Sequence, residues 1–182
     1  MLLFDTKADL AGLASFHGRL GEILALDETR LQTVRPELSG WSPLQQIFHV
    51  LLANELAYRN VRLVLEGSSA WLRRGEGPNL LGFLLLQAGR MPRGIAKAPR
   101  IVTPPKRPNL GIVRDTLASN EAARAEIAAG LDAVLSAGRL DGGTGVPHQD
   151  LGNLGPAPWI AFAALHGRHH LAIAEELLAA SG

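Results

Sequence analysis

The sequence predicts an all-α fold, a four-helix bundle built as one domain over residues 1–182. Four long segments repeat their apolar residues at the three- and four-residue spacing of amphipathic helices. No window of four to eight residues shows the alternation of a half-buried strand, and β-branched residues are sparse. A length of 182 residues also fits a single hydrophobic core of ordinary size.

The first two predicted helices span residues 8–30 and 42–66. Apolar residues in the first recur at intervals of three, four and seven: Leu10, Leu13, Leu20 and Leu24. Its start can be capped by Asp5 or Thr6. In the second helix Ser42 is placed as N-cap and Pro43 takes the first turn, where a missing N–H costs nothing. Because the second helix is apolar on nearly every face, it is expected to be central.

Two further helices are predicted over residues 110–137 and 157–180. A Pro/Gly-rich insertion at residues 67–108 separates the second and third helices and contains six of the eleven prolines. We expect this insertion to be mostly irregular, with one short helix near residues 79–87, and to lie over the bundle end that bears the histidines. The Gly-rich segment 142–155 is expected to be a loop.

Composition excludes several classes of protein. Eighteen Lys+Arg against seventeen Asp+Glu leave a net charge of +1, without the basic footprint of a nucleic-acid-binding protein. The chain has no cysteine, which excludes disulfides, thiolate metal sites and a Cys nucleophile. The longest apolar run, Leu80–Leu86, is far shorter than the roughly 20 residues that cross a bilayer, so it is interpreted as a buried helix or loop. With no basic stretch near Met1, we expect a cytoplasmic protein with no membrane or nucleic-acid partner.

The predicted last helix carries two histidines on its core-facing stripe. His166 and His170 lie four residues apart, one turn along the same face, which is the spacing with which helical histidines bind one metal. His49 lies in the second helix and can also face the core. Three imidazoles would leave open positions for water or substrate, as in catalytic zinc sites. The alternative is that each is a core histidine bonded to a carbonyl or a carboxylate, because burying it unpaired costs about 1–3 kcal/mol.

The sequence resembles the DinB-like superfamily in two stretches. Trp41-Ser42-Pro43 opens the helix that contains His49, and Leu151-Gly152-Asn153-Leu154 leads through Trp159 into His166-Gly167-Arg168-His169-His170. The resemblance covers nearly the whole chain and looks closest to the metal-dependent hydrolases and bacillithiol-type thiol transferases. It implies a bundle of 1-2-4-3 helix order and one divalent metal ion, zinc or nickel, held by His49, His166 and His170. It also implies that the nucleophile is either an activated water or a low-molecular-weight thiol used as co-substrate.

Together these observations predict a divalent-metal-dependent thiol transferase or hydrolase with a small-molecule substrate. His148, in the segment before the last helix, is a candidate acid, base or substrate contact, with a solvated loop position as the alternative. Glu55 is a candidate for orienting a ligand ring, or an ordinary surface glutamate. The competing function is a non-catalytic, dimeric helical bundle that binds a ligand or takes part in a stress response. Its metal site would be vestigial or structural. A structural site would be closed by a fourth ligand such as His148 or Glu55.

His17 and the basic residues of the insertion are weaker candidates. His17 continues the apolar stripe of the first helix, so we expect core packing or a place at the lip of the site. Arg73, Arg74 and Lys97 are among the residues that make the insertion basic. A solvated surface is expected there, with the mouth of a site for an anionic substrate as the alternative.

Overall fold

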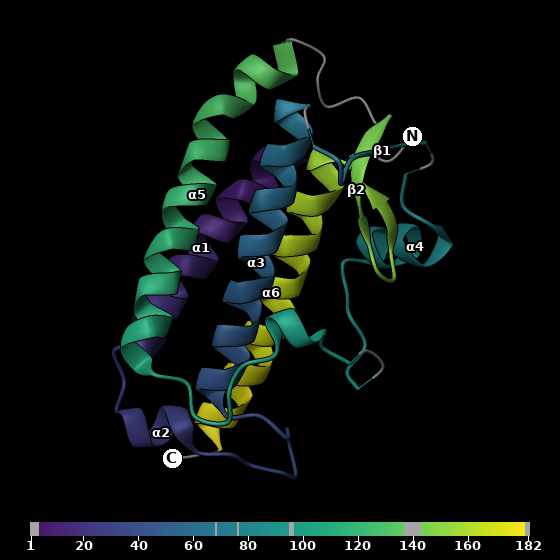
Figure 1. The fold of residues 1–182 in the computed structure, drawn as a ribbon. Helices are drawn as coiled ribbons and strands as arrows, with labels where there is room; N and C mark the ends of the chain where they lie inside the picture. The colour runs from purple at the N-terminus through teal and green to yellow at the C-terminus, as the bar shows by residue number, and fades with distance from the viewer. Residues whose placement is uncertain (1–3, 68, 76, 95–96, 137–142, 181–182) are drawn as a thin grey trace.

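The computed structural model describes residues 4–67, 69–75, 77–94, 97–136 and 143–180, and most of them are helical. Four long helices lie side by side (Figure 1): α1 (Thr6–Leu24), α3 (Pro43–Glu66), α5 (Leu110–Ser136) and α6 (Pro156–Ala179). Shorter elements occupy the connections: α2 (Glu28–Gln32), α4 (Leu80–Ala88) and the 3₁₀ turn η1 (Arg100–Val102). Three of the long helices, α3, α5 and α6, match the predicted ranges closely, and position 137 lies outside the described residues.

The ends of α3 follow from its capping residues. Ser42 Oγ accepts the backbone N–H of Gln45 at 3.3 Å, and the Gln45 side chain accepts the backbone N–H of Ser42 at 3.0 Å. This capping box satisfies two backbone donors that the first turn leaves unpaired. Gly67 ends the helix in the left-handed conformation, with φ of 72°, which glycine adopts without a steric penalty. The predicted second helix is confirmed.

The predicted first helix is wrong at its C-terminal end. Its start is capped by Asp5, but α1 ends at Leu24 rather than near residue 30. Asp27 then begins the separate helix α2, because its carboxylate accepts the backbone N–H of Thr29 at 2.9 Å. An N-cap residue has a non-helical backbone, so it starts a new helix and does not continue the old one.

The bundle is built on the pairing of α3 with α6, which run alongside each other (Figure 1). α3 also packs against α5, and α1 packs against both α5 and α6. The first and second long helices therefore lie diagonally across the bundle, and the expected 1-2-4-3 order is not confirmed. The largest fully buried core side chains include Leu13, Leu20, Leu44, Ile47, Leu51, Tyr58, Ile160 and Leu177.

A small antiparallel sheet beside the bundle corrects the all-α prediction to a mostly helical fold. Its strands lie in the order β1 (Arg73–Arg74), β2 (Thr144–His148) and β3 (Gly152–Leu154). The described part of the predicted loop 142–155 is thus a β-hairpin, in which Val146 pairs with Leu154, while position 142 lies outside the described residues. Strands of two to five residues, with Gly and Pro among them, are too short for alternation to be recognised.

The insertion is mostly irregular, as predicted, and α4 forms where the short helix was expected. It also lies over the histidines, since the backbone of Val102 contacts His49. His166, however, is the eleventh residue of the 24-residue helix α6, so the covered region is the flank of the bundle and not its end. The expectation that Leu80–Leu86 is buried is wrong: Gly82 is the buried residue of α4. No described helix combines the length and apolarity needed to span a membrane.

Candidate metal centre

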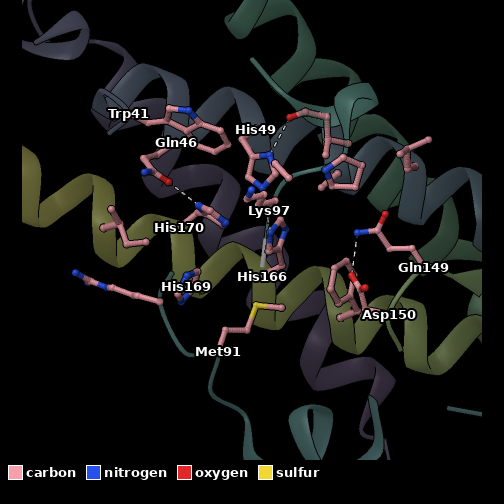
Figure 2. Close-up of a pocket in the computed structure, with 18 of the residues that line it drawn as sticks. Trp41, Gln46, His49, Met91, Lys97, Gln149, Asp150, His166, His169 and His170 are labelled. Carbon is pink, nitrogen blue, oxygen red and sulfur yellow. Dashed lines mark hydrogen bonds between the residues drawn. The ribbon is translucent and has the colours of Figure 1, made fainter. Parts of the chain in front are cut away.

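Three histidines from α3 and α6 converge on one point (Figure 2). His49, His166 and His170 each offer one ring nitrogen, and these atoms all lie within 4.8 Å of one another. The Nε2 atoms of His49 and His166 are 3.3 Å apart, and the ring centroids of His166 and His170 are 4.5 Å apart. The structure thus brings together the three residues that the sequence singled out as metal ligands.

One distance within the cluster already has the value that a shared metal ion would give. Two nitrogens bound to one tetrahedral zinc, each at about 2.0–2.1 Å, lie about 3.3–3.4 Å apart, and the Nε2 atoms of His49 and His166 have that separation. Imidazole is a ligand type that suits zinc and nickel. Among the residues that the structure describes, no fourth His, Asp or Glu joins the group. A metal bound here would therefore keep open positions.

The backbone of the insertion orients the His49 ring. Its Nδ1 lies 2.8 Å from the carbonyl oxygen of Val102, an atom that can only accept, so Nδ1 carries the proton and donates. In the neutral ring Nε2 is then unprotonated and presents its lone pair to the cluster. A carbonyl that fixes the tautomer in this way is a common partner of metal-ligating histidines.

Gln46 orients the His170 ring in the same manner. Its amide nitrogen donates to Ser39 Oγ at 2.8 Å, which turns the amide oxygen towards His170. That Oε1 atom lies 2.6 Å from His170 Nδ1, which therefore donates to it. Nε2 of His170 is left unprotonated in the neutral ring. Two of the three rings are thus held with a lone pair available to a cation.

His166 is held by packing. The ring of Phe162 stacks on it with centroids 5.2 Å apart and an angle of 13° between the planes. Its Nδ1 is buried and has no hydrogen-bond partner among the described residues. An unsatisfied buried nitrogen costs about 1–3 kcal/mol. The other nitrogen of the ring, Nε2, lies 3.3 Å from Nε2 of His49, so this is the atom that His166 offers to the cluster.

Burial keeps all three imidazoles neutral. It is the main cause that lowers the pKa of His49, His166 and His170 below the ordinary value of 6.5. Repulsion between the rings lowers the pKa of His166 and His170 further. Only a neutral imidazole has a lone pair for a metal, so the cluster is in the ligating state at neutral pH.

A cavity of about 760 Å³ opens in front of the cluster. Phe162 of α6 and Trp41, in the connection before α3, form part of its wall, and the insertion contributes Met91 and Lys97 (Figure 2 labels all of these except Phe162). A volume between about 300 and 1,000 Å³ is typical of small-molecule sites. The three histidines therefore face a space that can take a substrate.

His148 faces this cavity but does not join the cluster. It lies at the end of β2, with its ring centroid 4.8 Å from that of Phe162, which in turn stacks on His166. Its Nδ1 accepts the backbone N–H of Asp150 at 3.1 Å. Burial lowers the pKa of His148, and the Asp150 carboxylate opposes the shift. The structure thus places His148 where it can contact a bound substrate.

Two other candidates lie away from the centre. Glu55 is exposed and does not line the cavity. The role expected of it, orienting a histidine ring, is taken by the carbonyl of Val102 and the amide of Gln46. His17 is buried in the core at 1% exposure, so it is not a lip residue.

Sequence reasoning missed the two groups that orient the rings. Gln46 had a signal, because it precedes His49 by three residues and shares its helix face. Val102 had none, since every residue carries a backbone carbonyl.

Comparison with known proteins supplies no relative. No family model, curated protein or solved structure matches this chain. The DinB-like resemblance therefore remains a proposal, based on the residues around His49 and the closing helix. The chemistry of the centre is inferred from its own geometry.

Proposed function

We propose that this protein is a divalent-metal-dependent enzyme of the DinB-like type, a thiol S-transferase or a hydrolase that acts on a small molecule. One observation carries the proposal: three neutral imidazoles converge at the wall of a substrate-sized cavity. Zinc or nickel is the ion that we assign to the site.

A zinc or nickel ion held there would lower the pKa of a bound water or thiol, which supplies a nucleophile at neutral pH. His49, His166 and His170 hold the ion, while Val102 and Gln46 fix two of the rings. Because the chain has no cysteine, a thiol nucleophile comes from a low-molecular-weight co-substrate. The cavity has room for such a molecule beside an electrophile.

His148 is the candidate acid–base group. It faces the same cavity from β2 and contacts the ring of Phe162, which stacks on His166. A half-buried, neutral imidazole can accept a proton from the nucleophile or return one to the leaving group. Trp41 and Phe162 line the same space and give it apolar walls.

The non-catalytic bundle with a structural metal is the second candidate. A structural site is closed by four protein ligands. Glu55 is exposed, and among the described residues neither Glu55 nor His148 belongs to the group whose ligand atoms lie close together. This arrangement favours the open, catalytic type of site.

Elemental analysis of protein purified without a His tag tests the metal site. We expect about one equivalent of zinc or nickel in the wild-type protein and little in His49→Ala. Gln46→Ala should bind the ion about 10–100-fold more weakly, because it removes a group that orients a ligand. His169→Ala is the matched control, since it removes a neighbouring imidazole outside the trio and should keep the ion. Wild-type protein without metal, or equal losses in His49→Ala and His169→Ala, would contradict the proposal.

Activity of the metal-loaded protein separates the two functions. Thiol addition to a small electrophile and hydrolysis of an activated ester are measured side by side, with wild type and His148→Gln. Either activity, reduced at least tenfold in His148→Gln with metal content unchanged, supports the enzyme and the role of His148. A metal-loaded protein with neither activity supports the non-catalytic bundle.

A further inference from the structure

Helix α4 presents an apolar surface outward, away from the bundle. Four of its nine residues are large apolar side chains with high exposure: Leu80 (75%), Leu81 (56%), Phe83 (42%) and Leu84 (55%). Figure 1 shows α4 outside the four long helices, on the side of the hairpin. We call these four side chains the α4 surface.

The contact between α4 and the hairpin determines which side of the helix faces outward. Gly82 is buried against the hairpin, and a Cβ atom there would lie 2.3 Å from the carbonyl oxygen of Leu151. Gly82 is two residues after Leu80, about 200° around a helix, so the leucine points away from the contact. Asn79 fastens the helix: its side chain accepts the N–H of Gly82 at 2.8 Å and donates to the carbonyl of Asp150 at 2.9 Å. The glycine side faces inward and the leucine side outward.

Exposed apolar side chains are common singly, but adjacent ones on one helix indicate an interaction surface. Nothing in the part of the chain that the structure describes covers these four side chains, which are all exposed. The surface lies outside the cavity, because no α4 residue lines it. It therefore needs an occupant other than the substrate.

The cations closest to α4 come from neighbouring segments, because its own nine residues carry no charge. The insertion, residues 67–108, is basic as a whole, with eight Lys and Arg against the single acidic residue Glu76, but Arg93 pairs with Glu176 and Arg107 lies beside Glu28 of α2. Arg90 follows the end of α4 directly, and Arg73 and Arg74 are exposed on β1, which lies on the same side of the bundle (Figure 1). Because the surface combines exposed leucines with cations, an anionic and apolar partner complements it.

We propose that α4 docks on an anionic lipid surface, with its leucines in the interface and the nearby arginines on headgroup phosphates. Leucine and phenylalanine together with arginine are typical of segments that lie in the membrane interface, and here the arginines lie outside α4, on β1 and directly after the end of the helix. Nine residues span only about 14 Å of helix, so α4 lies on the bilayer and does not cross it. The apolar run in α4 is too short to span a membrane, but a helix that lies on the surface of a bilayer needs no such length. The proposal therefore replaces the expectation of no membrane partner.

A second copy of the chain fits the surface less well. A two-fold interface pairs a patch with itself, which would bring the arginines of both copies together. Stable protein interfaces also use about 20–30 residues on each side, against the four large apolar residues here. A lipid surface needs no matching shape and supplies the opposite charge.

Co-sedimentation with vesicles tests the proposal. We expect wild-type protein to bind vesicles of phosphatidylcholine with phosphatidylserine, to bind pure phosphatidylcholine much less, and to be released by high salt. The double variant L80E/L84E should lose at least tenfold in binding. Arg73→Ala and Arg74→Ala should each lose about fivefold. Ile112→Glu is the matched control, because Ile112 is also an exposed apolar residue (56%) but lies on α5. This variant should bind vesicles like wild type.

Circular dichroism checks that L80E/L84E is folded, as expected for exposed positions. The proposal is overturned if wild type stays in the supernatant with anionic vesicles, or if I112E loses as much binding as L80E/L84E. A dimer that L80E/L84E dissociates, with no vesicle binding, assigns the surface to a second copy instead. The outcome is independent of the metal centre, since His49→Ala should bind vesicles normally.

Discussion

At the scale of single residues, His17 is the most unusual group in the core. It is 1% exposed, and neither ring nitrogen has a hydrogen-bond partner among the described residues. Burial lowers its pKa from 6.5 to about 4, with a contribution from the positive charge of Arg124. The folded protein therefore holds this ring neutral at pH values where the unfolded chain protonates it.

This difference predicts how stability depends on pH. Between pH 6.5 and about 4 the unfolded state binds the extra proton, so stability contributed by His17 is complete above this window and falls as pH decreases through it. From about pH 7.5 to about pH 5 the loss is about 2 kcal/mol. His17→Leu removes the group, so urea denaturation at both pH values should show a smaller loss than in wild type. His169→Ala is the control: His169 is more exposed, so its removal should change the loss of stability much less. An equal loss of stability between the two pH values in wild type and His17→Leu would contradict the prediction.

At the scale of elements, the contact between α4 and the β2–β3 hairpin joins two segments that are distant in sequence. It depends on Gly82, because the carbonyl of Leu151 occupies the space that any side chain would need. It also depends on Asn79, whose backbone N–H donates to that same carbonyl at 2.9 Å. A nine-residue helix is not stable alone in water, so α4 relies on this contact.

We therefore predict that Gly82→Ala releases α4 while the long helices stay intact. The added Cβ would meet backbone 2.3 Å away, which cannot move like the end of a flexible side chain. Hydrogen exchange should show at least tenfold faster exchange in the amides of α4, with α3 and α6 unchanged. Gly18→Ala in α1 is the control, because nothing lies within 4 Å of its Cβ, and it should stabilise the protein by up to about 1 kcal/mol. Unchanged exchange in α4 would show that the contact is not needed.

At the scale of the whole molecule, we expect apolar packing to hold the fold together without the proposed metal ion. The core runs continuously through α1, α3, α5 and α6, and the three-histidine cluster sits at its flank beside the insertion. A chain of 182 residues buries about 70% of its unfolded surface, which supports folding without a metal.

Removal of metal with a chelator should leave the helical circular dichroism spectrum unchanged within about a tenth. Adding zinc at about 100 times its dissociation constant should stabilise the folded state by about 2.7 kcal/mol. For a domain of this size that raises the melting temperature by roughly 5–11 °C. The rise should be absent in His49→Ala. Loss of cooperative unfolding in the metal-free protein would show that the ion is part of the fold.

The sequence by itself determined the features that depend on neighbouring residues. Ser42, Pro43 and Gly67 bound α3 through contacts within a few positions, and the periodicity of apolar residues indicates the long helices. The spacing of His166 and His170 places both on one helix face, because four residues make about one turn.

Only the tertiary structure decided which groups complete the centre and which surfaces remain exposed. The partners of His49 and His170 come from positions 53 and 124 residues away, and one of them is a backbone carbonyl that any residue has. The exposure of α4 was equally hidden, since an apolar run is the same in sequence whether it is buried or presented outward. Local spacing specifies a helix and its faces, whereas what each face meets depends on chain segments that folding brings together from far apart in the sequence.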